Sequence, residues 1–176
     1  MVTVVDVAGL LARYSNLIRI ASYTDRTINF LGNNSGLLRN QLGEIMHGVA
    51  TSFLLTIRDY AKTSSEKEAR KIARELVKHQ QDELDTGTVM MILGITDPVA
   101  DEDHLHPRGF RVVSTISMLD EAATARIISE YGSLSAIVND SDVGFDRLDN
   151  AGVGNIRAVA ASFRQMRNTL QNKGPL

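Results

Sequence analysis

Two glycines separated by a single residue precede an arginine-bearing segment near the end of the chain, in the stretch RLDNAGVGNIRAVA. Gly152 and Gly154 allow backbone angles and close approaches that other residues cannot make. The amides of such a turn, with the unpaired N–H groups that open the next helix, can converge on one phosphate oxygen. Arg157 lies one turn further along and can add a charge-assisted hydrogen bond. The donors that this pattern predicts are the amides of Val153, Gly154, Asn155 and Ile156.

The charge around this turn is positive, although the whole chain carries a net charge of -2. From Arg147 to the end there are five basic residues and one acid, Asp149. Arg147, Arg164 and Arg167 are therefore predicted to extend a phosphate-binding footprint around Arg157. Any contact to DNA is expected to be with its backbone and shape, without base readout. The alternative is that the glycine turn serves only the packing of two helices.

Several kinds of chemistry are disfavoured by the rest of the sequence. There is no cysteine, which removes thiol nucleophiles and thiolate metal sites. The string DEDHLH offers carboxylates and imidazoles, but it lies in a loop pattern and is predicted to be a solvated linker with no metal. A base-excision glycosylase would place a catalytic acid beyond the hairpin, and no acid follows Asp149. We therefore predict no catalytic residue, no cofactor and no metal.

The first half of the chain follows a helical pattern. Apolar residues recur at steps of three and four from Val4 through Val7 and Leu11, which predicts a first helix of roughly thirty residues. The string LGNNSG ends it, because Gly and Asn favour left-handed caps and turns. A second helix is predicted from Leu37 to about Tyr60.

A third helix is predicted after KTSS, with Ser64 or Ser65 as its N-cap and acids in its first turn. Its charges alternate in sign at helical spacing, as in Glu66 and Arg70, which is typical of a solvated face. The apolar segment TGTVMMILGI follows it. The longest apolar run, Val89–Ile95, is far shorter than the ~20 residues that span a bilayer, so no membrane association is predicted.

The string TDPVADEDHLHP, with two prolines and no periodicity, predicts a boundary between two parts. We expect a helical linker or spine over residues 1–96, a connection over 97–106 and a second domain over 107–176. In the second domain the sequence predicts a tight turn near Met118 to Glu121, a helix to about Tyr131 and a short helix from Ser133. No strand pattern of period two is found, so the fold class is all-α.

Gly-Val-Gly followed by Asn-Ile-Arg-Ala resembles the helix-hairpin-helix motif that binds the DNA backbone. The ordered strings HPRGFRVVSTI, ISEYGSLSAIV and AGVGNIRA are similar to the C-terminal domain of the DNA integrity scanning proteins, the bacterial diadenylate cyclases. VTVVDVAGLL, LIRIA, LGNNSGLLRNQLGEI and LLTIRDY are similar, in order, to the helical linker of that family. The resemblance covers nearly the whole chain.

The resemblance implies an elongated helical linker bundle followed by a compact helix-hairpin-helix domain (RuvA domain 2-like). Family members carry an N-terminal cyclase domain that makes cyclic di-AMP from two ATP molecules, with an Asp-Gly-Ala turn and an Arg-His-Arg segment. Neither string occurs here, so we expect a chain without its cyclase domain. The implied partner is DNA, through its phosphate backbone and with junctions as a candidate form, in the bacterial cytoplasm at the nucleoid. The sequence leaves the oligomeric state open.

Some residues depart from the family pattern. Val159 and Ser162 stand in the final helix where charge is expected, and Asn150 stands where such hairpins place an apolar residue. The earlier hairpin has no glycine, and its Asp120 and Glu121 are expected to supply charge to a helix N-terminus. One competent hairpin is therefore predicted. The rival hypothesis is a structural or protein-interaction scaffold, in which the glycine turn only packs and the long first helix is the working surface.

Overall fold

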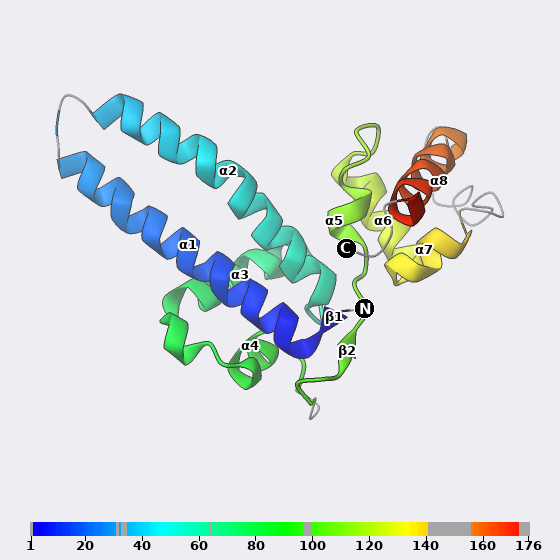
Figure 1. Cartoon of the computed structure of the whole chain (residues 1–176), viewed down its shortest axis with the longest axis horizontal. Coiled ribbons are helices and arrows are strands. Elements are labelled where there is room, and N and C mark those ends of the chain that lie inside the picture. Colours follow the sequence, from blue (N-terminus) through cyan, green and yellow to red (C-terminus); the bar gives the residue numbers. More distant parts are fainter. Residues whose placement is uncertain are drawn as a thin grey trace. The chain divides into compact units, whose positions relative to one another are not determined.

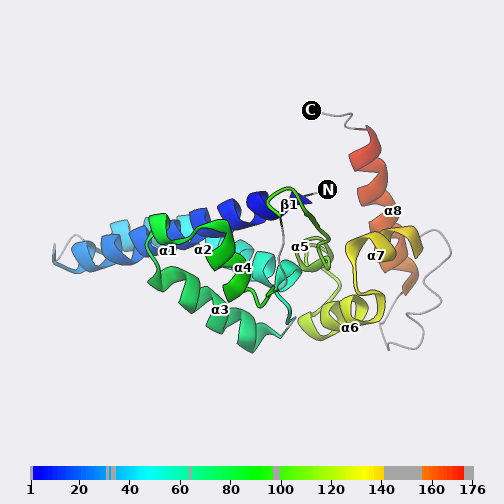
Figure 2. The ribbon, with the colours of Figure 1, turned by 90° about the horizontal axis from the view of Figure 1, so that it is seen from below.

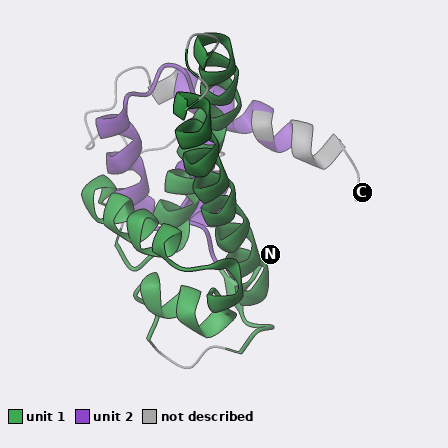
Figure 3. Cartoon of the chain, turned by 90° about the vertical axis from the view of Figure 1, so that its left-hand side faces the viewer, with its two compact units in different colours: residues 1–105 green, residues 106–176 purple. Residues whose placement is uncertain are grey.

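The computed structural model describes residues 2–30, 32, 35–63, 65–96, 100–140 and 156–172. The chain folds into two compact units, residues 1–105 and residues 106–176 (Figure 3). Helices dominate both units, and the only strands in the described ranges are two pieces of two residues each. The prediction of an all-α fold is therefore confirmed.

The first unit is built on a long antiparallel pair of helices, α1 (Val4–Phe30) and α2 (Ser35–Tyr60) (Figure 1). Both helices were predicted close to these bounds from apolar spacing. Then follow α3 (Glu66–Lys78), the short 3-10 helix η2 (Gln81–Glu83) and α4 (Thr86–Ile92). They lie along one end of the pair, where α1 begins and α2 ends (Figures 1 and 2).

The core of the first unit gathers at that covered end. Leu11 of α1, Ile57 of α2 and Leu76 of α3 are fully buried. The hydroxyl of Ser15 donates a buried hydrogen bond of 2.8 Å to the carbonyl oxygen of Leu76 and so ties α1 to α3. The cover continues for about one turn beyond Ser15, where Asn16 donates to Gln81 and Arg19 to the carbonyl oxygen of His79, and Ile28 is the one further residue of α1 that is buried. Exposed apolar side chains on this part of the pair are Leu17, Ile20, Tyr23, Phe30, Leu37, Leu38 and Ile45.

The start of α1 is fixed by residues almost a hundred positions away. Strand β1 (Val2–Thr3) pairs antiparallel with β2 (His104–Leu105), a pairing that the sequence did not predict. The backbone amide of Val4 then donates to the carbonyl oxygen of Asp103 at 2.8 Å. In the string DEDHLH the acidic and histidine side chains are exposed and Leu105 packs against the core, while the backbone caps a helix. It is more than the solvated connection that we expected.

A side-chain cap completes the same helix start. The Thr3 hydroxyl donates to the carboxylate of Asp6 at 2.6 Å, and the Asp6 amide donates back to the Thr3 oxygen at 3.3 Å. The Thr3 amide also donates to the Asp6 carboxylate at 3.2 Å. The two amide hydrogen bonds satisfy backbone donors that the start of a helix leaves open. The hydrogen bonds from the Thr3 side chain and then from its backbone lower the pKa of Asp6 below its usual value, because they favour the ionised form.

The second unit contains four helices in its described part: α5 (Phe110–Val113), α6 (Glu121–Tyr131), α7 (Leu134–Asp140) and α8 (Ile156–Asn172). The end of α6 at Tyr131 and the short helix after Ser133 are as predicted. Gly132 joins them with a φ of 71°, and its amide donates to the carbonyl oxygen of Ile128 at 2.8 Å. This left-handed C-cap is the conformation that glycine adopts at little cost.

Candidate nucleic-acid interface

The predicted phosphate-binding residues divide between two parts of the chain. Arg147, Gly152, Val153, Gly154 and Asn155 lie outside the described residues, as does Asn150. Ile156 and Arg157 form the first turn of α8, which therefore begins directly after the Gly-Val-Gly-Asn string. The side chains that the structure places are those of Arg164 and Arg167, both on α8.

Helix α8 has one buried side and one solvent-facing side. Val159, Ala160 and Phe163 are buried, with 0%, 2% and 2% of their surface exposed. Arg164 is exposed and Arg167 is half-buried. Since residues three and four apart share a helix face, Arg164, four residues after Ala160, borders the buried stripe, and it is exposed there. Arg167 lies nearer the packed side, four residues after Phe163.

The burial of Val159 explains why an apolar residue stands where the family pattern led us to expect charge. Val159 is part of the core of the second unit, and a charge there would be costly to bury. The hydroxyl of Ser162 donates to the carbonyl oxygen of Ala158 at 3.0 Å, within the same helix. Neither position is therefore an exposed site at which a basic residue would contact a phosphate. The sequence signal was available, because positions 159, 160 and 163 have the spacing of an apolar stripe.

In the predicted turn near Met118 to Glu121, the carboxylate of Asp120 has a structural role. Asp120 is the N-cap of α6, and its Oδ1 accepts a hydrogen bond of 2.7 Å from the amide of Ala123. Glu121 stands in the first turn of the same helix. Negative charge at this position is favourable because it meets the positive end of the helix dipole. The expectation of charge at a helix N-terminus is therefore confirmed.

Replacing Asp120 with alanine is expected to lower the free energy of unfolding by about 1 kcal/mol, because the Ala123 amide loses its partner. Asp120→Asn keeps an accepting oxygen and is expected to stay within about 0.5 kcal/mol of the native chain. Urea denaturation followed by circular dichroism measures both. Equal losses in the two variants would contradict a capping role.

The described residues hold no group of three or more His, Cys, Asp or Glu side chains that is suited to a metal ion. Within the same residues, no helix combines the length and the apolar character that a membrane crossing requires.

On α3, Arg70 pairs with Glu66 as predicted, while Lys71 pairs with Glu68 at 2.6 Å. The mixed charges of that helix are thus partly matched among themselves.

The fold and the site together define an all-α protein in which a unit built on two long helices is followed by a smaller helical unit. Residues 1–101 match the family described as the DisA bacterial checkpoint controller linker region. The chain therefore belongs to the DisA family, the DNA integrity scanning proteins, which confirms the resemblance seen in the ordered sequence strings.

Individual relatives extend the match beyond the linker region. The chain is 32% identical over 168 residues to the DNA integrity scanning protein DisA of Symbiobacterium thermophilum, covering 95% of this chain and 47% of the relative. It is 33% identical over 161 residues to DisA of Acetivibrio thermocellus, covering 90% and 44%. DisA of Carboxydothermus hydrogenoformans is 29% identical over 170 residues, with 95% and 48% covered. The chain thus spans about half the length of the curated relatives it matches.

Proposed function

We propose that this chain is a non-catalytic module that binds the DNA backbone. The observation that carries the proposal is the match to DNA integrity scanning proteins over 95% of the chain, since these relatives are named for an action on DNA. The proposed site is the Gly-Val-Gly turn with the first turn of α8. Gly152 and Gly154 would form the cradle, and Arg157 would pair with a phosphate.

The described geometry supports this assignment at one further position. Arg164 follows Arg157 by seven residues, which is two turns of a helix, and it is exposed at the edge of the buried stripe of α8. A cation there can reach a second phosphate of the strand that the turn holds. Arg147 and Arg167 would extend the footprint. We further propose that the chain prefers branched DNA. In the intact protein, DNA binding would be coupled to cyclic di-AMP synthesis.

The expected result with fluorescent duplex and four-way-junction DNA is binding that weakens steeply with salt. For two to four neutralised phosphates, the slope of log affinity against log salt is about -2 to -4. Arg164→Glu is expected to lower the affinity about tenfold or more at low salt and to make the slope shallower by about 1, because one phosphate contact is lost. Arg157→Glu and Gly154→Leu are expected to weaken binding further, since they alter the cradle itself.

Lys67→Glu is the matched control, because it makes the same change of charge on exposed α3 of the first unit. Its effect on DNA affinity is expected to be less than about twofold, because Lys67 is not part of the proposed cradle or footprint. If the native chain binds neither DNA at about 50 mM salt, where electrostatic binding is strong, the proposal is wrong. The glycine turn would then be a packing feature of a scaffold.

A further inference from the structure

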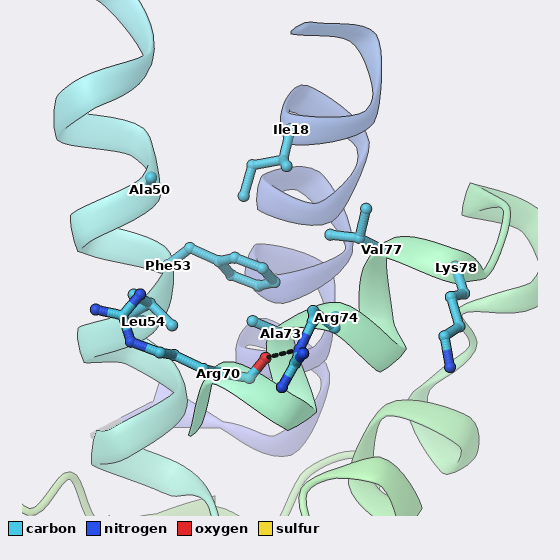
Figure 4. A pocket seen from close by; sticks show the side chains of 9 residues that line it. All are labelled: Ile18, Ala50, Phe53, Leu54, Arg70, Ala73, Arg74, Val77 and Lys78. Carbon is cyan, nitrogen blue, oxygen red and sulfur yellow. Dashed lines mark hydrogen bonds between the residues drawn. The ribbon is translucent and has the colours of Figure 1, made fainter. Parts of the chain in front are cut away.

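An apolar groove with a basic edge lies among α1, α2 and α3, wholly inside the first unit. Its volume is about 580 Å³, within the range typical of binding sites. Figure 4 shows Ile18, Phe53 and Val77 turned toward the space between the three helices. The apolar lining consists of Ile18, Ala50, Phe53, Leu54, Ala73 and Val77. The basic edge consists of Arg70, Arg74 and Lys78.

The groove continues along the long helix pair past the reach of α3. A second hollow of about 480 Å³ shares Ile18 and Ala50 with the first and extends to Leu42. From Leu54 to Leu42 along α2 is about 18 Å at 1.5 Å per residue. The two hollows together therefore form an extended groove, with small residues in its walls such as Ala21 and Gly43. Such a shape suits a helix of about three turns better than a compact small molecule.

The charges on the edge decide which helix would fit. Arg70, Arg74 and Lys78 follow one another at four-residue spacing, so they line one face of α3. Arg70 pairs with Glu66, and the Lys78 ammonium lies 2.6 Å from a carboxylate oxygen of Glu75. Both pairs are exposed at the surface, where such pairs contribute little and exchange readily.

Arg74 has a different environment from its two neighbours. Its Nε donates to the carbonyl oxygen of Arg70 at 3.2 Å, and no carboxylate of the described residues pairs with it. The opposite wall is neutral near Ala50. Further along the second hollow, Asp25 and Arg39 neutralise each other at 3.3 Å. Arg26 also lines the second hollow. The lining of the two hollows is therefore positively charged, and three of its cations lie in a row on α3.

We propose that this groove binds an amphipathic α-helix of a partner protein, with apolar side chains on the floor and carboxylates along the α3 edge. Apolar anchors at positions i, i+4 and i+7 of the partner would fill the lining, as in other helix-in-groove interfaces. Its acids would meet Arg70, Arg74 and Lys78. This inference is independent of the proposed DNA site, which lies in the second unit.

The test uses the full chain and two designed, fluorescein-labelled helical peptides of about 18 residues, about five turns. One has leucine on one stripe and glutamate on its flanks, and the other has lysine in place of each glutamate. Fluorescence anisotropy is expected to show the acidic peptide binding at least about tenfold more tightly than the basic one. The combined change Arg74→Glu with Lys78→Glu is expected to reverse this preference.

Two further variants keep the result interpretable. Lys67→Glu with Lys71→Glu makes the same charge change on α3 outside the groove, and it is expected to retain the preference for the acidic peptide. Ala50→Trp fills the junction of the two hollows and is expected to abolish binding of both peptides. Ala50 is exposed, so this variant is expected to stay folded, as checked by its thermal unfolding.

Equal affinity for the two peptides, or no binding of either, would overturn the proposal. So would a preference that survives the reversal of Arg74 and Lys78. Self-association of the chain that Ala50→Trp removes, and with which the acidic peptide does not compete, would assign the groove to a second copy of the chain instead. The DNA affinity of the groove variants is measured alongside and is expected to be unchanged, so the two proposals fail separately.

Discussion

Phe163→Ala is expected to lower the free energy of unfolding of the second unit by about 3–5 kcal/mol, the usual cost of truncating a buried phenylalanine. Phe163 is only 2% exposed, and it stands on α8, which packs against α7. The substitution removes apolar surface from the core and leaves a cavity where the ring was. A domain of this size is stabilised by roughly 0.05–0.15 kcal/mol per residue, so the loss is a large part of the total.

Urea denaturation followed by circular dichroism measures this loss, and hydrogen exchange of the α8 amides locates it in the second unit. Asn168→Ala is the control on the same helix, because Asn168 is exposed and its truncation is expected to change the free energy by less than about 0.5 kcal/mol. Phe163→Ala is also expected to weaken DNA binding, since α8 carries Arg157 and Arg164. Similar unfolding curves for the two variants would mean that α8 is not held by this side chain.

Leu11→Ala is expected to destabilise the first unit by about 2–5 kcal/mol. Leu11 is fully buried, with 0% of its surface exposed, in the core that joins α1 to α3 and α4. Its truncation leaves a cavity in a close-packed core, and the surrounding helices can only partly close that space.

Leu17→Ala makes the same chemical change six residues later on the same helix, where 46% of the residue's surface is exposed. Its effect is expected to stay near or below about 0.5 kcal/mol, as for other surface positions. Urea denaturation compares the two variants directly. If both cost the same, α1 would be buried along its whole length in solution, for instance against a second chain.

The local pattern of the sequence was enough to predict most helices. Steps of three and four between apolar residues indicated the long first helix, which the structure places at Val4–Phe30. Glycine and asparagine between Leu31 and Gly36 indicated its end. Acids at the starts of α3 and α6 marked their first turns. These features depend on interactions between residues a few positions apart, and they can therefore be predicted from the sequence alone.

Family membership was also visible in the sequence, although no single motif decided it. A Gly-Val-Gly turn alone is common in helical proteins, whereas seven similar strings in the same order are far more restrictive. The match of residues 1–101 to the DisA linker region confirmed that interpretation. The residues of the turn itself stay a prediction, together with the DNA contacts that depend on them.

The sequence by itself determined the helical periods, the position of the turns and the family, because these follow from neighbours along the chain. Only the tertiary structure decided that the backbone of Asp103 caps α1 and that Val159 belongs to the core. It also decided that Arg74 borders an apolar groove formed with α1 and α2. Each of these requires segments distant in sequence to meet, and such contacts follow from how whole helices pack against one another.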